Sequence, residues 1–171
     1  SLTDATGTEL SARQVVLATP LRVAAAGIAM PDAPEDLRRA MQATPTWMAG
    51  QAKAVIRYDR TFWRDRGLSG RIASRIGPLA EVHDHSTAQG RPALFGFVGW
   101  PPEARDPATL ETAIRDQLTR CFGPDAPQPV SITLQDWARD PLICTAADHG
   151  GAHPDLPPSI LRQSHMQGRL H

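Results

Sequence analysis

Lys53 is the only lysine in a chain that also holds seventeen arginines. It lies within residues 51–58, Gln-Ala-Lys-Ala-Val-Ile-Arg-Tyr, a stretch whose pattern predicts a strand. A primary ammonium is a compact donor that can lose its proton when desolvated, whereas a guanidinium stays charged and favours planar partners. A lone lysine can therefore mark a place where one point donor is needed. Periodicity alone favours the plainer interpretation, in which Lys53 shares a solvated strand face with Val55 and Arg57.

The four tryptophans of the chain stand beside a single tyrosine. An indole ring is large and apolar with one donor that needs a partner, so core packing is the ordinary interpretation for all four. Trp137 differs because it ends a predicted strand just before a long segment rich in proline and glycine. Since ligands often meet a scaffold where strands lead into loops, Trp137 is a candidate binding residue.

The histidines form two pairs that resemble parts of metal sites. His83 and His85 would share one face of an extended segment, but no third ligand is near them in sequence. His149 and His153 have the four-residue spacing of a helical zinc pair, yet the glycines between them and Pro154 oppose a helix. We therefore predict no metal site.

Nucleophilic catalysis and phosphate binding have no local support in the chain. Cys121 and Cys144 are too few for a disulfide framework, which predicts reduced and mostly packed thiols. Neither has both a basic residue and a histidine beside it, and no Gly-x-Ser-x-Gly motif occurs. Residues 67–70, Gly-Leu-Ser-Gly, predict a turn, because a phosphate site needs a strand, a glycine-rich turn and a helix start in succession.

The composition is that of a globular protein. The 171 residues are 41% hydrophobic, enough for one core or slightly more. Eighteen basic and eighteen acidic residues leave no net charge, and no basic run exceeds two residues, which argues against nucleic acid or an anionic membrane as a partner. No apolar run could span a bilayer and no signal-peptide pattern opens the chain, so we expect a cytoplasmic protein.

Two helices are predicted. The clearer one spans residues 106–122, where Asp106 can cap the N-terminus ahead of a proline and an apolar stripe of helical period runs up to a glycine. The other spans residues 32–43, with Asp32 as its N-cap and a glutamate three residues later.

The remaining periodic segments predict strands and complete an α+β fold. The apolar run at residues 15–18 is typical of a strand buried on both faces, although nothing before it could supply neighbours. We predict a mixed sheet of five or six strands with both helices packed on one face, and an opening strand that belongs to a different sheet. Besides residues 51–58, the predicted strands of the main sheet are residues 71–76, 79–85, 94–100 and 130–135.

Four stretches carry a family resemblance. In chain order they are residues 15–21 (Val-Val-Leu-Ala-Thr-Pro-Leu), residues 30–34 (Met-Pro-Asp-Ala-Pro), residues 50–64 (Gly-Gln-Ala-Lys-Ala-Val-Ile-Arg-Tyr-Asp-Arg-Thr-Phe-Trp-Arg) and residues 137–141 (Trp-Ala-Arg-Asp-Pro). Together they resemble the C-terminal half of the flavin-containing amine oxidases, the family of monoamine oxidase and bacterial polyamine oxidases. The stretch around Lys53 is the most specific match.

The resemblance implies roles for two residues. In that family the lysine of this strand holds a water against the reactive nitrogen of the flavin, which makes Lys53 the implied catalytic residue and a cofactor-binding residue. Trp137 corresponds to the tryptophan that packs beside the flavin, which makes it the second implied cofactor-binding residue. The implied cofactor is FAD, held non-covalently because Cys144 is displaced by two positions from the family's flavin-linking cysteine. The Gly-x-Gly-x-x-Gly fingerprint is absent from the chain.

The resemblance also implies a domain division and an activity. Residues 1–21 would be a remnant of an FAD-binding domain, and residues 22–171 a substrate-binding domain whose C-terminal loop leads back toward it. The implied reaction is oxidative deamination of a small-molecule amine with O2 as acceptor, and the chain would be inactive without the FAD-binding portion as its partner. One alternative is a non-enzymatic binding or assembly module that keeps this fold without a cofactor. Another is an unrelated α+β domain, to which a structure lacking a sheet around Lys53 would point.

Overall fold

The computed structural model describes residues 1–150 and 155–171. The chain forms two compact units, one made of Ser1–Trp47 with Pro141–His171 and the other of Met48–Asp140. The predicted boundary after residue 21 falls inside the first unit. The assignment of residues 1–21 to an FAD-binding domain and of residues 22–171 to a substrate-binding domain stays a prediction.

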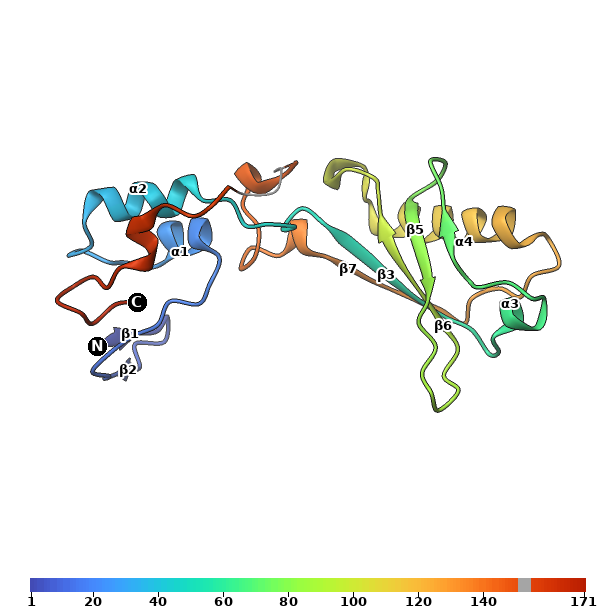
Figure 1. The fold of residues 1–171 in the computed structure, drawn as a ribbon, viewed down its shortest axis with the longest axis horizontal. Coiled ribbons are helices and arrows are strands. Elements are labelled where there is room, and N and C mark those ends of the chain that lie inside the picture. Colours follow the sequence, from blue (N-terminus) through green and yellow to red (C-terminus); the bar gives the residue numbers. More distant parts are fainter. Residues whose placement is uncertain (151–154) are drawn as a thin grey trace. The chain divides into compact units, whose positions relative to one another are not determined.

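A five-stranded sheet organises the unit Met48–Asp140 (Figure 1). The strand order is β4-β5-β6-β3-β7, and every neighbouring pair is antiparallel. The predicted α+β fold is confirmed, but the prediction of a mixed sheet is wrong, because the chain returns after β6 to the far side of β3 and so places no two parallel strands side by side. The strands are β3 (Ala52–Arg57), β4 (Ile72–Ala73), β5 (Leu79–Asp84), β6 (Ala93–Val98) and β7 (Ser131–Asp136).

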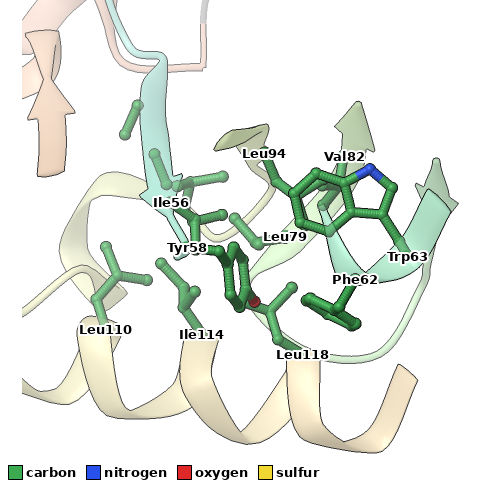
Figure 2. Packing of buried hydrophobic residues seen from close by; sticks show 13 residues of the cluster. Ile56, Tyr58, Phe62, Trp63, Leu79, Val82, Leu94, Leu110, Ile114 and Leu118 are labelled. Carbon is green, nitrogen blue, oxygen red and sulfur yellow. The ribbon is translucent and has the colours of Figure 1, made fainter. Parts of the chain in front are cut away.

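Helix α4 (Pro107–Phe122) covers one face of this sheet. The predicted cap is confirmed, since the Asp106 carboxylate accepts a hydrogen bond from the backbone N–H of Thr109 at 3.1 Å. Figure 2 shows three side chains of the helix directed at the sheet, and each is almost completely buried: Leu110, Ile114 and Leu118. Burying one such side chain contributes about 1.5–3 kcal/mol, so this stripe anchors the helix.

One buried polar side chain of α4 also holds the start of β5. The Gln117 amide accepts a hydrogen bond from the Leu79 N–H and donates one to the Leu79 carbonyl, both at 2.8 Å. Gly77 approaches this amide so closely that a Cβ would lie 2.6 Å from the Gln117 side chain, and its φ of +97° also favours glycine. The polar group is therefore satisfied inside the core and fixes the register of β5 against the helix.

The short helix α3 (Phe62–Asp65) closes the far end of the core. The Trp63 ring is completely buried, and its Nε1 donates to the Asp84 carboxylate at 2.8 Å. Arg64 Nε donates to the same oxygen at 2.7 Å. Partial burial alone would raise the pKa of Asp84, but the hydrogen bonds from Arg64, Trp63 and Ser86 outweigh it and hold that pKa well below its ordinary value.

The other unit has a separate apolar cluster. This unit contains the hairpin strands β1 (Leu2–Thr3) and β2 (Glu9–Leu10) and the helices α1 (Leu21–Gly27) and α2 (Glu35–Ala43). The predicted second helix exists, but Pro34 and not Asp32 is its N-cap residue. The prediction that it packs on the main sheet is wrong, because an apolar stripe identifies a buried face without identifying the partner. The buried members of this cluster are Ala24, Met30, Ala33, Leu37 and Met41.

The predicted opening strand is not a regular strand. Val15 N–H donates to the Arg169 carbonyl at 2.8 Å and Leu17 N–H to the His171 carbonyl at 2.7 Å, which makes a short parallel pairing with the end of the chain. Val16 is 74% exposed, so burial on both faces does not hold within the described residues.

Short 3₁₀ helices complete the described structure: η1 (Pro102–Ala104), η2 (Trp137–Arg139), η3 (Ala146–Asp148) and η4 (Ser159–Arg162). Across residues 1–150 and 155–171, no helix combines the length and apolar character needed to cross a membrane.

Candidate functional site

Lys53 lies on the face of the sheet opposite to α4. Along β3 the alternate residues Ala52, Ala54 and Ile56 are buried in the core, whereas Lys53 and Val55 are half-buried on the other side. The predicted division of the strand into two faces is therefore confirmed. Because α4 occupies only the core side, we call the side that carries Lys53 the open face.

Three aromatic rings surround the lysine ammonium. Lys53 Nζ is 4.9 Å from the ring centroid of Trp137, 5.4 Å from that of Phe97 and 5.7 Å from that of Phe95. These distances are within the range of cation–π attraction. We call Phe95, Phe97 and Trp137 the aromatic cluster. Both residues that the sequence nominated, Lys53 and Trp137, thus meet in one place.

Strand register explains how the cluster assembles. Lys53 pairs with Phe97 on β6, and Val55 pairs with Phe95 two residues away, so both phenylalanines share the face of the lysine. The two phenylalanine rings meet edge to face at 5.0 Å. Trp137 follows β7 directly, and its backbone N–H donates to the Gln51 carbonyl at 3.1 Å, which ties the start of η2 to the start of β3.

A buried arginine forms hydrogen bonds to the segments next to β3 and β6 and to the end of β7, behind this site. Arg105 is 4% exposed, and its Nε donates to the Trp100 carbonyl at 2.6 Å. Its Nη1 donates to the Gly50 carbonyl at 2.8 Å and to Asp136 Oδ1 at 3.1 Å. The guanidinium therefore connects the segments next to β3 and β6 with the last residue of β7.

Asp136 links Arg105 to the turn that carries Trp137. Its Oδ1 also accepts from the Ala138 N–H at 3.1 Å and so caps the 3₁₀ turn that begins with Trp137. Its Oδ2 is buried without a hydrogen bond among the described residues, and Arg139 Nε is 3.6 Å from that oxygen. Such a carboxylate depends on nearby cations for its compensation, the buried Arg105 and the more exposed Arg139. Arg105 and Asp136 thus position the indole ring.

Sequence reasoning missed Phe95, Phe97 and Arg105 as members of the site or its support. The two phenylalanines had a usable signal, because their spacing of two places them on one face of a strand. Arg105 had none, since it follows two prolines in an irregular segment and its partners are carbonyl groups far away in sequence.

The described members of the two histidine pairs do not assemble into a metal site. His83 Nε2 is 3.1 Å from the Glu81 carboxylate, and the His85 ring lies 5.7 Å from the ring of Phe95. No group of three or more His, Cys, Asp or Glu side chains that could hold a metal occurs in the part of the chain that the structure describes. His153, from the second predicted pair, lies outside the described residues.

The cysteines differ in their surroundings. Cys144 is buried, as expected for a packed thiol, whereas Cys121 is exposed. The expectation of packed thiols therefore holds for one of the two.

Comparison with known proteins decides the family. A family model described as flavin containing amine oxidoreductase matches residues 1–162. This chain belongs to that family. The chain also resembles solved structures of flavin amine oxidases. With cyclohexylamine oxidase from Brevibacterium oxydans IH-35A it shares 25% identity and a TM-score of 0.72, covering 95% of this chain and 37% of that one.

Putrescine oxidase supplies two further structural matches to this chain. A double mutant of putrescine oxidase gives 23% identity and a TM-score of 0.71, and the wild type bound to putrescine gives 21% and 0.68. Each alignment covers 92% of this chain and 36% of the putrescine oxidase chain, and each shows likeness of fold. The chain thus spans little more than a third of the length of these relatives.

Proposed function

We propose that this chain is part of an FAD-dependent amine oxidase that oxidatively deaminates a small-molecule amine with O2 as acceptor. Lys53 is the proposed catalytic residue, and Lys53 with Trp137 would contact the cofactor. The observation that supports this most is the position of the Lys53 ammonium among the aromatic cluster, on a sheet face that α4 leaves open.

The chemistry of the open face fits the ring system of a flavin. Flat aromatic side chains offer an apolar wall, and a single cation beside them suits a ring that gains negative charge on reduction. When bound, the flavin supplies a hydride acceptor and passes electrons to oxygen. The chain lacks the Gly-x-Gly-x-x-Gly turn that holds the ADP part, so the proposal includes inactivity without the FAD-binding portion.

The surroundings of Lys53 leave its donors available. Among the described residues Lys53 makes no hydrogen bond or ion pair, and its contacts are with ring faces. A cation held by aromatic faces keeps its three N–H groups for other acceptors. Lys53 would therefore orient a water molecule by donating to its oxygen and would favour negative charge nearby. Trp137 would exclude bulk water from one side of the site.

The role of Lys53 is tested by Lys53→Met in the complete protein. We expect flavin reduction or reoxidation to slow by roughly 100-fold, because the variant keeps the shape of the side chain and removes its charge and donors. Stopped-flow absorbance of the flavin measures both steps. Arg75→Met, which removes a cation from an exposed position of the same unit, is the control and should leave both rates unchanged. Unchanged kinetics in Lys53→Met would remove the lysine from the mechanism.

A second measurement separates the enzyme from a binding module that keeps the fold without a cofactor. The complete protein, purified with its FAD-binding portion, should show the visible absorbance bands of a flavin. Denaturation should release the flavin, because Cys144 does not match the position of a covalent link. Absence of flavin from every such preparation would favour the non-enzymatic module.

A further inference from the structure

The open face carries a second feature beyond the aromatic cluster. A hollow of about 410 Å³ lies where β3 ends beside the turn between β5 and β6. Val55 and Arg57 line it from β3, and His85, Thr87 and Arg91 line it from the turn. Lys53 and Arg57 are four residues apart on the same face, which places their backbones roughly 13 Å apart along the strand. The hollow is therefore distinct from the lysine site.

The two arginines of the hollow lack the acidic partners that Arg64 and Arg105 of the same unit have. Arg64 pairs with Asp84, and Arg105 pairs with Asp136. By contrast, Arg57 and Arg91 make no side-chain hydrogen bond or ion pair with any residue within 1–150 or 155–171, and the lining of the hollow contains no Asp or Glu. Two guanidinium groups that line one space repel each other, and an anion between them would relieve that repulsion.

The turn that carries Arg91 is held by hydrogen bonds. Thr87 N–H donates to the Arg91 carbonyl, and Arg91 N–H donates to Thr87 Oγ1, both at 3.2 Å. The His85 N–H donates to the Ala93 carbonyl at 2.8 Å, which anchors the base of the turn. His85 also packs its ring against Phe95 at 5.7 Å. The backbone beneath the polar side chains of the hollow is thus already ordered before any ligand binds.

We infer that this hollow is a binding site for an oxyanion, the carboxylate or phosphate group of a small molecule. Arg57 and Arg91 would each present a planar fork of donors, which matches the spacing of two oxygens in either group. Thr87 would add its hydroxyl and His85 a ring nitrogen. This site does not depend on the flavin or on the proposed oxidase reaction, because all of its residues come from this chain.

The test is a titration of the chain, observed by NMR at the arginine Nε–Hε signals, with inorganic phosphate and separately with acetate. Sodium chloride keeps the ionic strength constant, because screening alone alters surface charges. We expect saturable shifts at Arg57 and Arg91. The double variant Arg57→Gln with Arg91→Gln should weaken binding roughly tenfold or more, since hydrogen bonds from charged groups are lost.

The matched control is Arg75→Gln with Arg120→Gln. It removes the same charge from two exposed arginines of the same unit and should retain the wild-type affinity. Tighter binding of phosphate would identify a phosphate ligand, and tighter binding of acetate a carboxylate ligand; each supports the site. Equal weakening in both double variants would mean that only overall charge attracts the anion, which overturns the inference. Linear, non-saturating shifts with both probes would overturn it as well.

Discussion

The two faces of the sheet differ in how tightly their side chains are packed. On the covered face, β3 and α4 enclose side chains that solvent does not reach, such as Ile56 and Ile114, and the contacts are apolar (Figure 2). On the open face, the same strand presents Lys53 to the aromatic cluster, and all of these side chains are half-buried. Neighbouring residues of one strand thus have different surroundings, because successive side chains point to opposite sides.

This difference in burial predicts that substitutions are tolerated better on the open face than on the covered face. Losses on the covered face create cavities in a packed core, whereas losses on the open face remove contacts that are already partly solvated. The support at the strand ends is the exception, since Arg105, which pairs with Asp136 behind the open site, is as buried as the core.

The largest effect is expected from Arg105→Met. This change removes the buried cation next to Asp136 together with the donors to the Trp100 and Gly50 carbonyls, and leaves only Arg139, at 3.6 Å, beside the carboxylate; it should cost about 4 kcal/mol in the free energy of unfolding. Urea unfolding followed by circular dichroism measures it. Arg115→Met is the control, because Arg115 pairs with Glu111 on a part-exposed helix surface and should cost only about 1 kcal/mol. Equal losses in both variants would show that the buried connection is not special.

The next effect concerns the covered face alone. Ile114→Ala should lower the free energy of unfolding by about 3 kcal/mol, because Ile114 is completely buried and its removal leaves a cavity. Ile76→Ala makes the same chemical change at a residue that is 75% exposed, and it should change stability by less than about 0.5 kcal/mol. A small loss at Ile114 would contradict the packing described for α4.

A smaller, pH-dependent effect is expected at the edge of the core. Because the native pKa of Asp84 is held below its ordinary value of 3.8, the ionised carboxylate stabilises the fold above that value, and the contribution is lost as the pH falls through the native pKa. Asp84→Asn should therefore cost about 1 kcal/mol at pH 7 and progressively less at lower pH. Thermal unfolding across pH 2–7 measures this. Asp65→Asn, at an exposed position, is the control and should change the free energy of unfolding at pH 7 by less than about 0.5 kcal/mol.

The smallest effect is expected on the open face. Lys53→Met should change the free energy of unfolding by less than about 1 kcal/mol, since a cation–π contact is exchanged for an apolar one. Ala54→Met places the same side chain one residue further along, on the covered face, where overpacking should cost about 1–3 kcal/mol. Chemical denaturation of the pair compares the two faces directly. Similar losses in both would mean that the open face is packed as tightly as the core.

The periodic elements were predictable from sequence because each depends on local patterns. The strand around Lys53 and the capped helix α4 follow from alternation, a capping aspartate and an N-terminal proline. The packing partner of α2 was not predictable, because an apolar stripe fits any apolar surface. The antiparallel arrangement of the sheet was not predictable either, because local patterns do not show which strand β7 pairs with after α4.

The candidate site was predictable only in part. Lys53 and Trp137 were found through residue type and family resemblance, and the structure places the ammonium 4.9 Å from the indole centroid. The positioning by Arg105 could not be predicted, because a guanidinium that bonds to backbone carbonyls leaves no trace in the identity of its partners. The catalytic and cofactor-binding roles of Lys53 and Trp137 stay predictions.

The order of the strands gives the two site residues unequal freedom. Lys53 belongs to a strand bonded on both sides, to β6 and to β7, whereas Trp137 follows β7, whose described pairing is with β3 alone. Loosening that single ladder would swing the indole aside while leaving the ammonium in place. Amide hydrogen exchange should therefore be faster in the edge strand β7 than in the central strand β3.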